Sequence, residues 1–282
     1  MSFDLRYKHN RSIFVQCETI VFSVDTEHRC FTCGGFSVNQ FIKEQLKKVL
    51  PATMSQASFA GKNTEELLWA EVFNSTVCES SWLLNKSFSL CRAAISYLGL
   101  YLLYRVLDEM KPKSILEMGL GQSTKMISQF VSQDQQRIHY VVENNKDWAA
   151  FYLNNNTVPQ NTKLTMLTAE IRPFKSANVR AYKDFKETFG TKRFDYIAID
   201  GPGSYDMKKY SRIDVLSILP DCLNSSFVIT LDDAQRNPEK ATAREVCSAL
   251  DAAHIKYRFT TYYGLRGVAL WASEDWGFLC SL

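Results

Sequence analysis

The stretch that decides the fold is SILEMGLGQS, residues 114–123. A short apolar run ends in Glu117, and two glycines follow at Gly119 and Gly121. Glycine lets the backbone approach a ligand where a side chain would collide with it. The stretch therefore predicts a buried strand whose end lies at a binding site.

Around this stretch, predicted strands and helices alternate. The strands cover residues 114–119, 139–143, 164–170, 194–200 and 227–233, and an antiparallel pair, 256–263 and 267–273, closes the series. The helices cover residues 90–110, 123–132, 146–155, 178–190, 210–223 and 238–254. Such alternation requires right-handed crossovers and a sheet covered on both faces. The expected fold class is α/β, with a Rossmann-like, doubly wound, mostly parallel sheet and an antiparallel closing strand.

The first ninety residues have a different, mixed pattern. Strands are expected at residues 17–24 and 29–38, and helices at residues 41–50 and 64–73. We therefore divide the chain into a small mixed α/β region, residues 1–90, and a main domain, residues 91–282. The small region is expected to cover the acceptor of the main domain or to make the contact of a homodimer.

Composition excludes several classes of function. The formal charge of +3 over 282 residues gives no basic face of the kind that binds nucleic acid. The longest apolar stretch, residues 93–104, is shorter than the ~20 residues that cross a bilayer. The chain opens without the apolar core of a signal peptide, so its eight cysteines are expected to be reduced thiols. We expect a cytoplasmic protein with no integral membrane segment.

Acidic residues end all five parallel strands. In chain order they are Glu117, Glu143, Glu170, Asp200 and the pair Asp232 and Asp233. Ligands of open doubly wound sheets bind at the carboxyl ends of the strands, so these acids are expected to meet at one edge.

Two kinds of ligand compete for this edge. A dinucleotide site requires a third glycine where this chain has Thr124, and Glu117 would repel a phosphate. A cationic ligand with an amino group and a ribose fits better, because Glu117 can bind the ammonium group and Glu143 can accept both ribose hydroxyls.

The motifs ILEMGLGQS, VVENN and FDYIAIDGPGS resemble those of the class I S-adenosylmethionine-dependent methyltransferases. The resemblance covers roughly the last two thirds of the chain. It implies that S-adenosylmethionine is the cofactor and that its site contains Glu117, Gly119, Gly121, Ser123, Glu143, Asn144, Glu170 and Asp200. The chain departs from many relatives at Gln122 and Ser123, where they have a third glycine. The loop after Asp200 also contains Pro202, so the resemblance does not define the acceptor site.

Two narrower resemblances concern the acceptor. The first is a resemblance to motifs of methyltransferases that act on plant polysaccharides, and it rests on GLG, on Glu143 with Trp148, and on DGP. The trio Asp200, Asp232 and Asp233 resembles the metal ligands of sugar O-methyltransferases. These resemblances imply transfer of methyl to a hydroxyl of a sugar or polysaccharide, with Asp200 and Asp232 in catalysis. All three aspartates would hold Mg²⁺ or Mn²⁺, which lowers the pKa of a bound hydroxyl.

Several alternatives stay open at this point. Asp233 either binds metal or caps the following helix, and Arg236 either pairs with an acidic acceptor or lies on the surface. Trp148 either flanks the adenine or packs a helix on the sheet. The alternative functions are a non-catalytic methyltransferase-like binding module and a nicotinamide-dependent oxidoreductase.

Overall fold

The computed structural model describes residues 4–8, 12–17, 20–25, 61, 64–89 and 94–282. The chain forms two compact units, residues 1–60 and 61–282. In the first unit, β1 (Asp4–Lys8), β2 (Ser12–Cys17) and β3 (Ile20–Asp25) form an antiparallel sheet. The strand predicted at residues 17–24 corresponds largely to β3. The strand predicted at 29–38 and the helix predicted at 41–50 lie outside the described residues.

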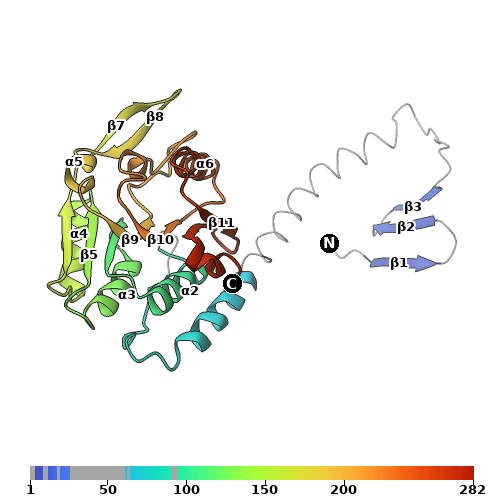
Figure 1. Cartoon of the computed structure of the whole chain (residues 1–282). Helices are drawn as coiled ribbons and strands as arrows, with labels where there is room; N and C mark the ends of the chain where they lie inside the picture. The colour runs from blue at the N-terminus through green and yellow to red at the C-terminus, as the bar shows by residue number, and fades with distance from the viewer. Residues whose placement is uncertain (1–3, 9–11, 18–19, 26–60, 62–63, 90–93) are drawn as a thin grey trace. The chain divides into compact units, whose positions relative to one another are not determined.

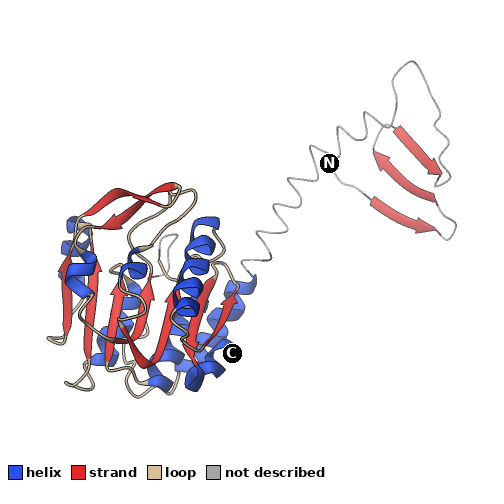
Figure 2. Cartoon of the chain, turned by 45° about the horizontal axis from the view of Figure 1, so that its top comes forward, coloured by secondary structure: helices blue, strands red, loops and turns tan. Residues whose placement is uncertain are grey.

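The second unit contains a seven-stranded sheet in the order β11-β12-β10-β9-β4-β5-β6 (Figure 2). Its strands are β4 (Ser114–Met118), β5 (Ile138–Glu143), β6 (Thr162–Met166), β9 (Phe194–Ile199), β10 (Leu223–Leu231), β11 (Tyr257–Tyr262) and β12 (Val268–Ser273). Only β12 runs against its neighbours, because β10 and β11 both pair with it in antiparallel fashion. The predicted fold class is confirmed.

Helices cover both faces of this sheet. One face carries α2 (Tyr97–Arg105), α3 (Gln122–Val131) and α4 (Lys146–Asn155), and the other carries α5 (Phe185–Phe189) and α6 (Asn237–Ala252) (Figures 1 and 2). A helix over residues 64–77 packs on the α2 side through Phe73 and Val77. Among the helices formed by described residues, none combines the length and the apolar character needed to cross a membrane.

The period-two alternation of β4 distributes its side chains between the two cores. Ile115 packs in the core on the α2 side, whereas Leu116 and Met118 pack in the core on the α6 side. Glu117 shares the face of Ile115, and its carboxylate therefore points under the helices rather than out of the sheet edge. This alternation decides where the first acid of the predicted site lies.

Two predicted helices are largely wrong. Residues 169–182 instead form a hairpin of β7 (Ala169–Phe174) and β8 (Ala177–Tyr182), and only α5 of the predicted helix 178–190 is helical. Burial alternates along β8, because Val179 and Ala181 are buried against Ile213, and this favours a strand. Of the predicted helix 210–223, only Asp214–Ser217 forms a helical turn.

The predicted helix 90–110 begins later than expected. Its first helical residue is Tyr97, and Ser96 caps it by accepting a hydrogen bond from Gly99 N at 3.2 Å. The helix continues through a π-helical turn over Val106–Met110. Residues 90–93 lie outside the described part of the chain. The remaining predicted helices and strands of the main domain are confirmed within a few residues.

A buried carboxylate holds the hairpin to the irregular segment that follows β9. Asp214 is fully buried, and its Oδ1 accepts a hydrogen bond from Tyr182 N at 2.8 Å. Arg172 Nη2 lies 3.6 Å from the same oxygen. Burial raises the pKa of Asp214 to about 7, although the hydrogen bond and Arg172 oppose this effect.

This raised pKa predicts a pH-dependent contribution to stability. The folded chain keeps the Asp214 proton up to about pH 7, whereas the unfolded chain releases it near pH 4, so this contribution falls as the pH rises through that window. Asp214→Asn removes the titration and keeps an oxygen for Tyr182 N. The free energy of unfolding of the variant, relative to the native chain, should rise by roughly 2–3 kcal/mol between pH 5 and pH 8. Urea unfolding at the two pH values measures it, and a pH-independent difference would contradict the burial argument.

Candidate functional site

A pocket opens at the carboxyl edge of the sheet, next to β4, where the order in which strands are added to the sheet reverses. From β4 the chain continues to β5 and β6 on one side, and β9 and β10 lie on the other. Ligands of open α/β sheets bind at such a switch point. The pocket has a volume of about 870 Å³, which is large enough for a nucleoside cofactor and part of an acceptor. Its walls come from the start of α2, the loops after β4, β5, β9 and β10, and the β11–β12 loop.

Two glycines allow the ends of β4 and β9 to meet at the bottom of the pocket. Gly119 has a φ of +103°, a conformation that glycine adopts without strain. A Cβ atom at Gly201 would overlap the Tyr182 hydroxyl oxygen and would lie 3.0 Å from Gly119 N. Burial keeps this phenol neutral by raising the pKa of Tyr182 well above its ordinary value. The two strand ends can therefore touch only because both positions lack a side chain.

Thr124 occupies the position of the missing third glycine. Its Oγ1 accepts a hydrogen bond from Gly121 N at 2.9 Å and so caps the start of α3. A Cβ atom at Gly121 would meet no atom within 4 Å, so the backbone alone does not require glycine there. Gly119 and Leu120 of this turn line the pocket, whereas Gly121 does not.

Glu143 is held in the wall of the pocket by backbone amides. Its Oε1 accepts hydrogen bonds from Asn144 N and Asn145 N, both at 2.7 Å, and its Oε2 accepts one from Leu120 N at 3.1 Å. Trp148 Nε1 donates to Leu120 O at 2.7 Å and ties α4 to the same loop. The end of β5 and the glycine turn after β4 therefore form one connected unit, as the sequence predicted for Glu143 and Gly119.

Glu117 lies below this pocket rather than in its wall. Its side chain is 1% exposed, and its Oε2 lies 3.1 Å from Nε2 of His139, whose Nδ1 lies 3.3 Å from Thr162 Oγ1. The other oxygen, Oε1, has no hydrogen-bond partner among the described residues. Glu117 instead lines a smaller cavity next to the pocket, and Ser123 lines the same cavity.

The other predicted cofactor residues are divided between the pocket and the surface. Gly119, Glu143, Asn144 and Asp200 line the pocket. Glu170 is exposed on β7 and does not line it. Trp148 stacks on Phe151 of its own helix, α4, with ring centroids 5.6 Å apart, so this contact does not pack the helix on the sheet. Trp148 does not line the pocket either.

The three predicted metal ligands come together. Asp200, Asp232 and Asp233 each offer a carboxylate oxygen, and these oxygens lie within 4.8 Å of one another. Within the described part of the chain, neither oxygen of Asp232 has a hydrogen-bond partner. Burial raises the pKa of Asp232, and the neighbouring Asp233 raises it further, whereas Arg212 and Arg266 lower it.

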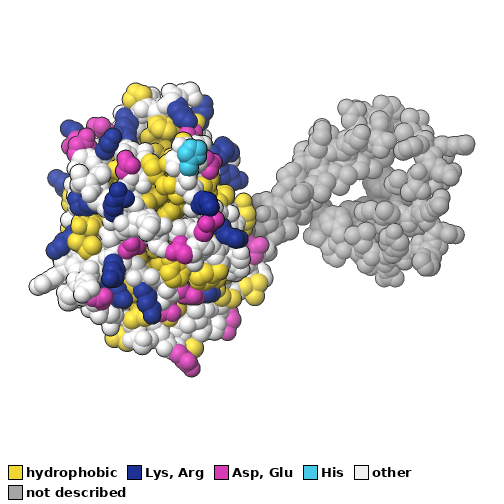
Figure 3. Space-filling model, in the orientation of Figure 1, with side chains coloured by type: hydrophobic (Ala, Val, Ile, Leu, Met, Phe, Trp, Pro, Cys, Tyr) yellow, Lys and Arg dark blue, Asp and Glu magenta, His cyan; other side chains and the backbone are white. Residues whose placement is uncertain are grey.

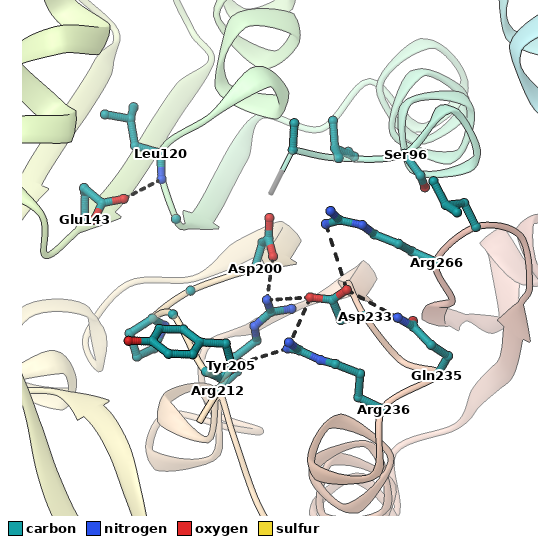
Figure 4. Close-up of a pocket in the computed structure, with 18 of the residues that line it drawn as sticks. Ser96, Leu120, Glu143, Asp200, Tyr205, Arg212, Asp233, Gln235, Arg236 and Arg266 are labelled. Carbon is teal, nitrogen blue, oxygen red and sulfur yellow. Dashed lines mark hydrogen bonds and ion pairs between the residues drawn. The ribbon is translucent and has the colours of Figure 1, made fainter. Parts of the chain in front are cut away.

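Three arginines surround these aspartates, and sequence reasoning missed two of them (Figure 4). Arg212 Nη2 lies 2.8 Å from Asp200 Oδ1 and 3.0 Å from Asp233 Oδ2. Arg266 lies 3.7 Å from Asp232 and 3.9 Å from Asp233. Arg236, which was weighed as a ligand for an acidic acceptor, pairs with Asp233 at 3.2 Å and with Glu239.

The two missed arginines differ in how they could have been found. β11 runs in the same direction as β9 and β10, so the loop after it, which carries Arg266, returns to the ligand edge. The strand pattern carried that signal. Arg212 lies in the segment that was predicted to be helical, and no sequence signal placed its side chain.

The carboxylates suit Mg²⁺ or Mn²⁺ in type but not in arrangement. These ions bind carboxylate oxygens at ~2.1 Å and exclude other groups from the space between them. Arg212 Nη2 already lies within 3.0 Å of Asp200 and Asp233. A divalent ion in contact with both would overlap the guanidinium group and repel its charge. The residues as arranged therefore do not fit a metal unless Arg212 moves away.

Solved structures of methyltransferases resemble this chain at low identity. A Podospora anserina methyltransferase with bound SAH has 14% identity and a TM-score of 0.45, over 79% of this chain and 96% of that chain. An O-methyltransferase from Bacillus cereus in complex with SAH has 12% identity and a TM-score of 0.45, over 75% and 91%. An O-methyltransferase of tomaymycin synthesis from Streptomyces achromogenes, in complex with SAM, has 17% identity and a TM-score of 0.44, over 72% and 97%. No family model and no curated protein matches the chain. The fold is therefore assigned from the strand order of the sheet and not from these similarities.

The contact between Gly119 and Gly201 predicts that alanine lowers stability more at Gly201 than at Gly203. Gly201→Ala should lower the free energy of unfolding by about 1–3 kcal/mol, because its Cβ must displace Tyr182 or the Gly119 backbone. Gly203→Ala is the matched control, since a Cβ there meets nothing within 4 Å. Denaturant unfolding compares the two variants. Equal stabilities would show that the strand ends tolerate a side chain.

Proposed function

We propose that the chain is an S-adenosylmethionine-dependent O-methyltransferase. The observation that carries the proposal is the carboxylate of Glu143, which three backbone amides hold at the pocket wall beside the glycine turn. A carboxylate in this position accepts hydrogen bonds from both hydroxyls of a ribose. The adjoining turn lines the same pocket through Gly119 and Leu120, beside which the rest of the nucleoside would lie.

The charge of the pocket favours a cationic cofactor. Four carboxylates and three guanidinium groups meet at its far side, namely Asp200, Asp232, Asp233 and Glu239 with Arg212, Arg236 and Arg266. Burial raises the pKa of Asp200 to about 7 and also raises that of Asp232, so this cluster has no fixed excess of negative charge near pH 7. The carboxylate of Glu143 adds negative charge in the pocket wall. A sulfonium with an ammonium group is attracted to this edge, whereas the pyrophosphate of a nicotinamide dinucleotide is repelled.

The reaction needs a base as well as a cofactor. The acceptor oxygen forms a bond to the methyl carbon while the bond from carbon to the sulfonium sulfur breaks, and the hydroxyl proton leaves to a carboxylate. Asp200 is proposed as that base, because it lines the pocket, with Asp232 directly behind it in the smaller cavity. The products are a neutral thioether, a methyl ether and a protonated carboxyl group.

The acceptor is proposed to be a sugar or polysaccharide hydroxyl. Polar groups line the pocket beyond Asp200, among them Ser204, Gln235 and Arg236. Tyr205 is 88% exposed and presents an amphipathic ring beside them. Figure 3 shows charges of both signs interspersed on the face that it presents, without a basic stripe of the kind that binds nucleic acid.

Three further expectations belong to the proposal. Residues 1–90 cover the acceptor or make a homodimer contact, the protein acts in the cytoplasm, and Glu117 and Ser123 take part in cofactor binding from the smaller cavity. The proposed function does not include the Mg²⁺ or Mn²⁺ expected from the sequence, because Arg212 lies between two of the expected ligands, Asp200 and Asp233.

Calorimetric titration with S-adenosylmethionine, S-adenosylhomocysteine and NAD tests this function. The native chain should bind the first two and not NAD. Glu143→Gln should weaken both by about 10- to 100-fold, because it replaces a charged acceptor of the ribose hydroxyls. Asp147→Asn, an exposed change in the first turn of α4, is the control and should bind like the native chain.

Other outcomes of the titration point elsewhere. Binding of NAD alone would favour the oxidoreductase, and binding of none of the three would favour the non-catalytic module. Undiminished binding by Glu143→Gln would remove the observation on which the proposal rests.

A further inference from the structure

Arg212 lies at the centre of the cluster that was expected to hold a metal ion. Its guanidinium group bridges two of the three aspartates through Nη2, at 2.8 Å from Asp200 and 3.0 Å from Asp233. Its Nη1 donates to the backbone oxygen of the third, Asp232, at 2.8 Å. One side chain thus contacts all three residues of the trio, as Figure 4 shows for Asp200 and Asp233.

The surrounding structure fixes this position. Arg212 is 4% exposed and has a φ of +52°, a left-handed conformation that a residue with a side chain adopts only when its surroundings impose it. The neighbouring residue Ser211 is held to α6, because Thr242 Oγ1 donates to its backbone oxygen at 2.5 Å. On the other side, Asp214 accepts a hydrogen bond from Tyr182 N. The segment is fastened on both sides of Arg212.

The ion pairs of Arg212 lie in the pocket wall and not in the hydrophobic core. Arg212, Asp200 and Asp233 all line the pocket, so the cluster faces the space for ligands rather than a closed core. Nε of Arg212 lies 4.0 Å from Glu239 Oε1 and has no hydrogen-bond partner among the residues that the structure describes. The guanidinium group therefore brings a positive charge to the pocket wall while it neutralises part of the acid cluster.

A guanidinium group and a divalent ion cannot share this position. Both require the carboxylate oxygens of Asp200 and Asp233, and their like charges repel at contact distance. Arginine stays protonated at any physiological pH, so its charge is permanent and needs no supply of metal. The side chain at residue 212 therefore determines whether a guanidinium group or a divalent ion occupies this position.

We propose that Arg212 is the built-in cation of this site, in the place where the trio of aspartates would otherwise hold a divalent metal. The native chain accordingly binds no Mg²⁺ or Mn²⁺ there. This exclusion of metal depends only on the contacts of Arg212. A second part rests on the proposed function: the guanidinium charge lies beside the acceptor oxygen and stabilises it as its proton leaves to Asp200.

Titration with Mn²⁺, followed by the loss of the free-ion signal in electron paramagnetic resonance, tests the exclusion. The native chain should bind no Mn²⁺ up to about 1 mM, the weak end of the range for protein carboxylate sites. Arg212→Met removes the charge and should bind Mn²⁺ with a Kd of about 0.1 mM or lower, at least tenfold below the concentration at which the native chain still binds none. Asp232→Asn in the Arg212→Met background should abolish the gain.

Two controls separate charge from disruption of the fold. Arg212→Lys keeps a positive charge and should still exclude Mn²⁺. Arg137→Met removes a partly buried arginine that pairs with Asp134 at 3.8 Å, away from the cluster, and should create no site. Circular dichroism establishes that each variant is folded before it is titrated.

Each result decides the proposal. Mn²⁺ binding by the native chain that Asp232→Asn weakens would overturn it, and this measurement needs no arginine variant to fold. A folded Arg212→Met that gains no affinity for Mn²⁺ would overturn it as well. The titration contains neither cofactor nor acceptor, so a failure of the proposed methyltransferase function would appear in the cofactor titration and not here.

Discussion

The close approach of two strand ends is the constraint on which the rest of the site depends. Gly119 and Gly201 bring the backbones after β4 and β9 into contact, with no room for a side chain at Gly201. This contact places the glycine turn, and through Leu120 N the carboxylate of Glu143, on one side of the switch point. It places Asp200 on the other side. A bound nucleoside can therefore reach both groups across a single pocket.

The second constraint is electrostatic, because carboxylates gathered at low exposure need nearby positive charge. The chain supplies most of that charge itself, through Arg212, Arg236 and Arg266. These arginines leave little demand for a divalent ion, and the carboxylate of Glu143 in the pocket wall suits a cationic cofactor. The same arginines explain how Asp200, in the pocket wall, can lie next to Asp232, which lines the smaller cavity.

Much of the fold could be predicted from the sequence, because most of its strands and helices have clear periodicity. The errors fall where local pattern and tertiary contacts disagree. β8 is rich in polar residues and resembles a surface helix, yet Val179 and Ala181 alternate into a core with Ile213. Residues 210–223 are apolar enough for a helix, but Asp214 and Arg212 bind partners far away in the sequence, and these contacts hold the segment in an irregular conformation.

The sequence by itself determined that acids lie at or next to the ends of β4, β5, β9 and β10 and that glycines follow β4 and β9, because these features depend only on local order along the chain. It therefore determined the edge of the sheet at which the site lies and the positions of Glu143 and Asp200 there. Glu170, expected at the end of the third parallel strand, lies instead on β7 of the hairpin. Only the tertiary structure decided that Glu117 turns beneath the helices, where it meets His139, since one residue of register chooses the face of a strand. Only the tertiary structure placed Arg212 among the three aspartates, because a contact between an irregular segment and two strand ends leaves no periodic trace in the sequence.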